Sequence, residues 1–217
     1  VTAHQDTPDI KVITGVRRCG KSTIMTMLAD ELQRQGIPGS NIFYKRFDAF
    51  DIPLDYGVGD LFDELTAASQ TLDDDFSWYV LLDEIQDVEG WEQVVRRLHT
   101  RPHTDVYLTG SNARLLSSDL STYLTGRYVE IGAYPLSFEE YLAFVHAADE
   151  RDQDDNPALK SIDEHLADYL LYGGMPGVFG LAERNPRTVE SELRGIYQSV
   201  LYKDVAQRFS IRDLEGL

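Results

Sequence analysis

The chain has 217 residues, 42% of them hydrophobic, enough to bury one large domain or a core with a smaller appendage. Its formal net charge of −17 disfavours non-specific nucleic-acid binding, which depends on basic surface that neutralises phosphates. One cysteine excludes an intrachain disulfide, and the sequence shows neither a membrane-length apolar run nor a secretory signal. We therefore expect a cytoplasmic protein without a membrane partner.

The first chemical motif follows a predicted buried strand at residues 11–14 (K-V-I-T). Residues 15–22 read G-V-R-R-C-G-K-S and fit the phosphate-loop pattern G-x-x-x-x-G-K-[ST]. Its glycines let backbone N–H groups turn toward phosphate, Lys21 brings a charge to the β and γ phosphates, and Ser22 can ligate Mg²⁺. The ATP-binding residues expected here are Gly15, Val16, Arg17, Arg18, Cys19, Gly20, Lys21, Ser22 and Thr23, with the residues at 17–19 as simple fillers of the loop.

A helix is predicted directly after this loop. Ile24, Met27, Leu28 and Leu32 recur at helical spacing. The positive amino end of that helix would point at the bound phosphates. The next strand is expected at residues 41–47.

An acidic pair ends the apolar run at residues 79–82. A central parallel strand delivers such carboxylates to its carboxyl edge, where ligands bind in open α/β sheets. Asp83 would hold Mg²⁺, mainly through water, and Glu84 would orient and polarise the water that attacks the γ-phosphate. A glutamate beside the metal carboxylate favours hydrolysis over transfer to a metabolite.

Further strands at 105–108 and 128–131, separated by helical stretches, predict a three-layer parallel α/β sheet. Asn112 or Ser111, just after the strand at 105–108, is expected to sense the γ-phosphate; the alternative is a turn capped by small polar residues. Arg127 opens the next strand and is a candidate for stabilising transition-state charge, from the same chain or a neighbour. The alternative is an ordinary surface arginine.

Composition shifts predict the domain boundaries. Residues 1–148 would form the P-loop core, 149–157 an acidic linker and 158–217 a helical lid interrupted by the Gly/Pro-rich turn at 172–177. The sequence begins without methionine and stops soon after a helix, so we expect a piece of a longer protein.

Six segments in this order, G-V-R-R-C-G-K-S, L-L-D-E-I-Q, T-G-S-N, L-T-G-R-Y, Y-P-L-S-F-E-E-Y and Y-G-G-M-P-G, resemble the prokaryotic AAA-like ATPases that carry a C-terminal domain of unknown function. These are related to the archaeal ATPases and the STAND signalling ATPases. The resemblance implies an ASCE-type P-loop core, a helical lid and a Gly-x-Pro turn that touches adenine, here ending at Pro176. It also implies a further C-terminal domain. Arg194 and Arg208 are available in the lid, and nothing around either selects it as a second sensor.

The function expected from these residues is Mg-dependent ATP hydrolysis that drives or resets a conformational switch between core and lid. The alternative is a nucleotide-gated protein-interaction module with negligible turnover. A small-molecule kinase is disfavoured by Glu84, and a GTPase by the lack of an Asn-Lys-x-Asp motif.

Overall fold

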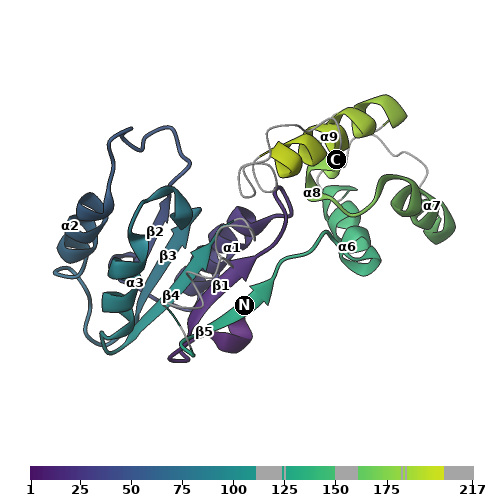
Figure 1. The fold of residues 1–217 in the computed structure, drawn as a ribbon. Coiled ribbons are helices and arrows are strands. Elements are labelled where there is room, and N and C mark those ends of the chain that lie inside the picture. Colours follow the sequence, from purple (N-terminus) through teal and green to yellow (C-terminus); the bar gives the residue numbers. More distant parts are fainter. Residues whose placement is uncertain (111–123, 125, 150–160, 182, 184, 203–217) are drawn as a thin grey trace. The chain divides into compact units, whose positions relative to one another are not determined.

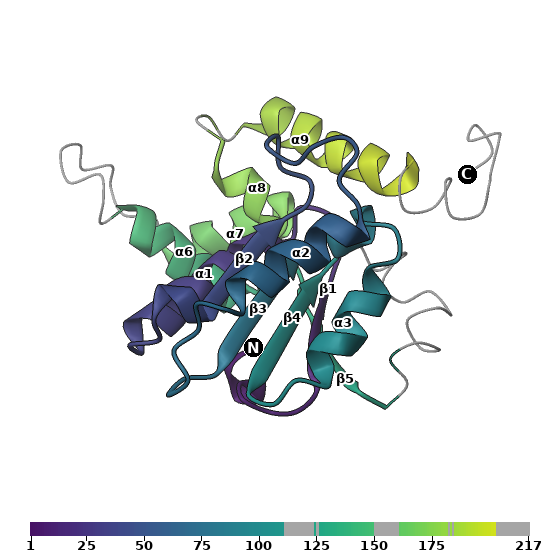
Figure 2. The same ribbon diagram turned by 90° about the vertical axis from the view of Figure 1, so that its left-hand side faces the viewer.

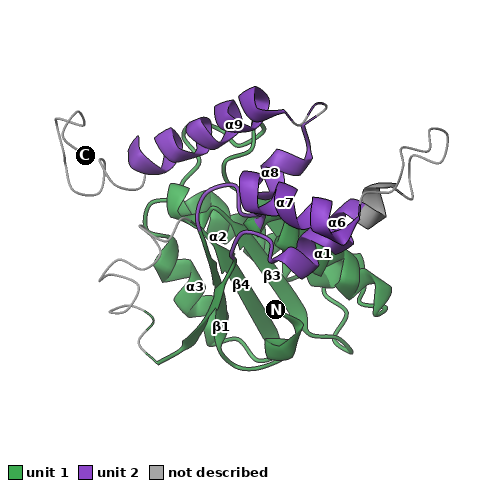
Figure 3. Ribbon diagram, turned by 90° about the vertical axis from the view of Figure 1, so that its right-hand side faces the viewer, with its two compact units in different colours: residues 1–15, 21–133 green, residues 16–20, 134–217 purple. Residues whose placement is uncertain are grey.

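The computed structural model describes residues 1–110, 124, 126–149, 161–181, 183 and 185–202 (Figure 1). The chain divides into two compact units (Figure 3). Unit 1 comprises residues 1–15 and 21–133, and unit 2 comprises residues 16–20 and 134–217. The middle of the phosphate loop therefore groups with the C-terminal helices. Most of the acidic linker expected at 149–157 lies outside the described residues, so the domain boundaries predicted there stay a prediction.

Unit 1 is built on a sheet of parallel strands, as the sequence predicts. In the part of the chain that the structure describes, five strands pair in the order β2-β3-β4-β1-β5. Their bounds are Ile10–Thr14 (β1), Ile42–Arg46 (β2), Trp78–Asp83 (β3), Thr104–Thr109 (β4) and Tyr128–Gly132 (β5). Because β4 separates β1 from β3, the phosphate loop and the acidic pair belong to strands that are not neighbours.

Helices cover both faces of this sheet, which gives the predicted three layers. They are α1 (Lys21–Arg34), α2 (Val58–Ala68) and α3 (Trp91–His99). Views at right angles show α2 and α3 on one face and α1 on the other (Figures 1 and 2). This is the arrangement that right-handed crossovers produce when the chain first moves outward to β2 and then returns through β3 to β4.

The central strands are buried because helices cover them on both faces. Every residue of β1 and of β3 is buried, whereas β2 and β5, at the sheet edges, are half exposed. Near-continuous apolar runs are what a doubly covered parallel strand requires. The core also includes Leu61 and Leu65 of α2 and Trp91, Val94, Val95 and Leu98 of α3.

A buried ion pair fixes the amino edge of the sheet. The Lys11 ammonium lies 2.5 Å from the Asp105 carboxylate, and the two side chains are 0% and 3% exposed. Tyr107 donates to the other Asp105 oxygen at 2.9 Å, and Lys11 donates to the Thr7 carbonyl at 2.7 Å. Such satisfied partners are what allow charges to remain in a core. The pair ties β1 to β4 in their observed register.

Unit 2 contains α6 (Phe138–Asp149), α7 (Ile162–Tyr172), the short α8 (Pro176–Phe179) and α9 (Pro186–Ser199). Side chains cap the amino ends of α7 and α9, through the reciprocal Ser161–Glu164 box and through Asn185. Aromatic rings join these helices, with Tyr141 packed on both Tyr169 and Phe179. Along the described chain, no helix is both long enough and apolar enough to span a membrane.

Candidate active site

The phosphate loop joins the end of β1 to the start of α1, the context its motif requires. Gly20 has φ +98°, a conformation that a side chain would strain. Lys21 is the first residue of α1 and is only 4% exposed. Its ammonium donates to the carbonyl of Gly15, the first loop residue, at 3.1 Å. The lysine therefore holds its charge at the opening of the loop, where phosphates would be neutralised.

One threonine holds the two acidic residues at the carboxyl edge. Asp83 is the last residue of β3 and is fully buried. The hydroxyl of Thr109, the last residue of β4, donates to Asp83 Oδ1 and accepts from the Glu84 amide at 3.0 Å. Since a hydroxyl can donate once and accept as well, Thr109 fixes both acidic residues at once.

Glu84 has a strained backbone and a held carboxylate. Its φ of +56° is left-handed, which is uncommon for residues other than glycine and clusters at functional sites. The Gln86 side-chain amide donates to Glu84 Oε2 at 2.5 Å. Glu84 as a residue is partly exposed, which suits a group that must reach a water molecule.

A chain of hydroxyls links α1 to Asp83. Thr26, one turn after Ser22, donates to the Ser22 carbonyl at 3.1 Å and lies 3.5 Å from the Tyr44 hydroxyl. Tyr44 in turn donates to Asp83 Oδ2 at 3.4 Å. Burial raises the pKa of Tyr44 and the Asp83 charge adds to it, so the hydroxyl stays protonated and can donate. The chain of hydroxyls thus connects the backbone carbonyl of Ser22 to the carboxylate of Asp83, and both residues are predicted metal ligands.

Pro176 lies beside the phosphate loop within unit 2. A Cβ built on Gly20 would be 3.9 Å from Pro176 Cγ. The turn before it is anchored by Gly174, whose carbonyl accepts from the Leu136 amide at 2.7 Å. The Gly-x-Pro turn that the resemblance assigns to adenine thus lies close to Gly20 of the loop predicted to hold the phosphates.

Alanine at position 174 is expected to loosen unit 2, because its Cβ would overlap the Leu136 carbonyl oxygen. Overpacking of this kind costs about 1–3 kcal/mol. We expect faster amide hydrogen exchange at residues 134–149 and 161–180 of unit 2, and no change at residues 1–15 and 21–110 of unit 1. Gly195→Ala is the control, since nothing lies within 4 Å of its Cβ position. Equal exchange in the two variants would contradict the prediction.

The structure corrects the role predicted for Arg127 within its own chain. Arg127 precedes β5, its carbonyl accepts from the Ile10 amide, and Tyr128 pairs with Ile10. It therefore lies at the amino edge of the sheet, the length of β1 away from Gly15. Five residues of strand span about 16 Å, beyond the reach of one side chain. A role toward a neighbouring subunit stays a prediction.

Ser111 and Asn112 lie outside the described residues, and so does Arg208. Arg194 is described and pairs with Glu190 at 2.6 Å.

Thr109, Tyr44 and Gln86 were not predicted from the sequence. A signal existed for Thr109, which ends a buried strand, and for Gln86, which lies two residues after Glu84. Tyr44 carried none.

Comparison with known proteins now decides the family. The profile described as "AAA domain" matches residues 7–142, more than half of the chain and all five strands. The chain belongs to the AAA domain family. Its membership, together with the phosphate loop, identifies this AAA domain as a nucleotide-binding P-loop protein, as the sequence predicts.

Two curated relatives align with nearly all of this chain. An uncharacterised protein of Haemophilus influenzae is 41% identical over 212 residues, which cover 96% of the chain and 49% of that protein. An uncharacterised protein of Methanocaldococcus jannaschii is 27% identical over 96% of the chain and 44% of its own length. The chain thus spans about half the length of these relatives.

Among solved structures, PCH-2 of C. elegans is similar in fold. It aligns over 92% of this chain and 63% of its own chain, with a TM-score of 0.54 and 13% identity. At that identity the likeness concerns the fold alone.

Proposed function

We propose that this AAA domain binds ATP with Mg²⁺ and hydrolyses it, and that hydrolysis drives or resets a conformational switch of its helical part. The proposal rests on two features that occur together in unit 1. One is the buried lysine of the phosphate loop, and the other is the acidic pair that Thr109 holds in place. A loop for phosphates alone would fit any nucleotide-binding protein. A held glutamate beside a buried aspartate is what hydrolysis needs in addition.

The reaction assigns one task to each side chain. Lys21 and the loop amides bind and neutralise the phosphates. Glu84 accepts a proton from a water molecule as the water oxygen bonds to the γ-phosphorus. The bond from that phosphorus to the β–γ bridging oxygen breaks, and ADP and inorganic phosphate leave. Thr109 keeps the Glu84 backbone in place, and Gln86 orients its carboxylate.

The residues present fit Mg²⁺. This ion takes oxygen ligands and commonly binds through one or two protein groups, with water and substrate phosphates supplying the rest. Asp83 offers a buried carboxylate whose oxygens retain lone pairs beside their bonds from Thr109 and Tyr44, and Ser22 offers a hydroxyl. Bound there, the ion would neutralise charge on the phosphate oxygens.

Contacts within unit 2 support the switch. Pro176 and α9 lie against residues 16–20 of the phosphate loop, so a change in that loop on binding or hydrolysis has a direct route to the helices. A switch needs contacts with the ligand that differ between two states, and loop residues 16–20 are the ones that would make them.

Steady-state ATP hydrolysis as a function of enzyme concentration tests the proposal. We expect Mg-dependent release of phosphate. Constant specific activity would mean that each chain completes its own site, whereas activity rising with concentration would make Arg127 the residue to substitute in trans. Absence of phosphate release at every concentration would contradict the hydrolysis.

A further inference from the structure

Arg18, at a variable position of the phosphate loop, has an unusual backbone. Its φ is +62°, in the left-handed region that residues with a side chain seldom adopt. Such a conformation persists only where the surroundings hold it. The sequence pattern gives no reason for an arginine here, because any residue fits the motif at this position.

The side chain of Arg18 is held by helix α9. Its guanidinium donates to Glu192 Oε1 at 2.6 Å, and Glu192 is 23% exposed. Gly177 makes room for this carboxylate, since a Cβ there would lie 3.0 Å from Glu192 Oε1. Arg18, Glu192 and Gly177 all belong to unit 2, as does Pro176 beside Gly20.

We infer that Glu192 is a positioning residue for nucleotide: by binding Arg18, it keeps the phosphate loop in the conformation that receives phosphates. The ion pair anchors the loop at its strained residue, and Pro176 lies beside Gly20, two residues further along the loop. Glu192 acts through Arg18 and needs no contact with nucleotide itself. The consequence for ATP affinity rests on the proposed function, whereas the effect on the loop does not.

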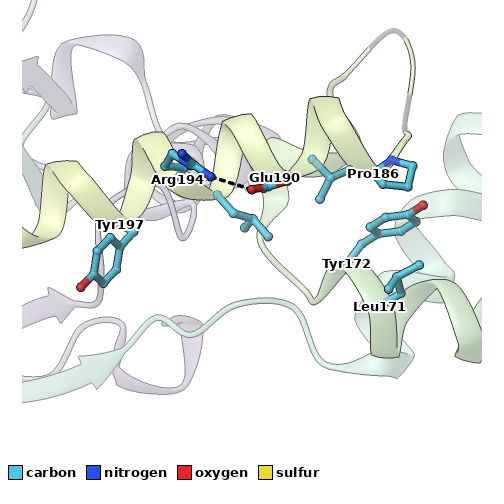
Figure 4. Close-up of a pocket in the computed structure, with 8 residues that line it drawn as sticks. Leu171, Tyr172, Pro186, Glu190, Arg194 and Tyr197 are labelled. Carbon is cyan, nitrogen blue, oxygen red and sulfur yellow. Dashed lines mark hydrogen bonds and ion pairs between the residues drawn. The ribbon is translucent and has the colours of Figure 1, made fainter.

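The same helix supplies a matched control. Glu190 forms an ion pair of equal length, 2.6 Å, with Arg194, and Figure 4 shows this pair on α9 beside a cavity of about 460 Å³. The cavity is lined only by residues of α7 and α9, and none of them belongs to the phosphate loop: Leu171, Tyr172, Pro186, Val189, Glu190, Leu193, Arg194 and Tyr197. Glu190→Ala therefore removes a charge and an ion pair from α9 without touching Arg18.

The alkylation rate of the Cys19 thiol measures the conformation of the phosphate loop in the absence of nucleotide. It is the one cysteine of the sequence, adjoins Arg18 and is 4% exposed. We expect Glu192→Ala to speed alkylation of Cys19 by N-ethylmaleimide about three- to fivefold, the range that losing a partly exposed ion pair allows. Glu190→Ala should leave the rate unchanged. An unchanged rate in Glu192→Ala, or the same increase in both variants, would overturn the inference.

Mg-ATP titration by calorimetry gives the second readout. Glu192→Ala should weaken binding about threefold, and adding it to Arg18→Ala should change nothing further, because Glu192 acts through that arginine. Additive losses, or tighter binding in Glu192→Ala, would overturn the inference.

The two readouts separate this inference from the proposed function. If the wild-type protein binds Mg-ATP but Cys19 is alkylated at the same rate in Glu192→Ala as in the wild type, the inference alone is refuted. Alkylation that depends on Glu192 in a protein that binds no Mg-ATP would refute the proposed function alone.

Discussion

Lys21→Ala is expected to weaken Mg-ATP binding by about 30-fold or more while the fold is retained. The lysine places an ammonium group in a buried position at the opening of the phosphate loop, and truncating a buried charge partner typically costs about 2–5 kcal/mol of binding. Alanine is a strong helix former, so the first turn of α1 should persist. Calorimetric titration measures the affinity, and circular dichroism checks the fold.

Lys45→Ala is the matched control for this loss. Lys45 of β2 also carries a charge on unit 1, but its ammonium binds the carboxylate of Glu64 on α2 at 2.6–2.7 Å, and Lys45 is no part of the loop motif. It should bind Mg-ATP as the wild type does. If Lys21→Ala did the same, residues 15–22 would not be a phosphate site, and the proposed function would lose its basis.

Glu84→Gln is expected to reduce ATP hydrolysis by about 10²–10⁴-fold and to leave Mg-ATP affinity within a few fold. The amide has the shape of the carboxylate and can still accept from Gln86, but it cannot take a proton from water. Single-turnover phosphate release measures the chemical step apart from product release.

The control is Glu89→Gln, because Glu89 is an exposed carboxylate a few residues further along the same segment. Hydrolysis by Glu84→Gln at the wild-type rate would remove Glu84 from the mechanism. If Glu84→Gln instead abolished hydrolysis and preserved the cellular role, the alternative of a nucleotide-gated interaction module would be favoured.

Local patterns in the sequence were enough to predict the strands and the position of the phosphate loop between a strand and a helix. The β-branched run before Gly15 and the apolar run before Asp83 are strands β1 and β3, because burial on both faces demands continuous apolar side chains. Arg127 shows an error that the same reasoning could have avoided. A residue that opens a parallel strand lies at the amino edge, opposite the edge where phosphates bind.

Contacts between residues far apart in the sequence could not be predicted from local patterns. Thr109 reaches Asp83 across 26 residues and Tyr44 reaches it across 39, so neither is visible before the strand order is known. Lys11 looked like part of an apolar run, yet its partner Asp105 is 94 residues away. Arg18 gave no signal, since its left-handed backbone and its bond to Glu192 exist only in the folded chain.

The strand order also sets when the site can form during synthesis. β1 is made first but pairs only with strands made much later: Val12 with Leu108 of β4, and Ile10 with Tyr128 of β5. A chain emerging from the ribosome can pair β2 with β3 long before β1 finds either neighbour. The phosphate loop therefore acquires its final support late. A nascent chain that ends before β5 should be unable to hold nucleotide and should expose the unpaired edge of β1.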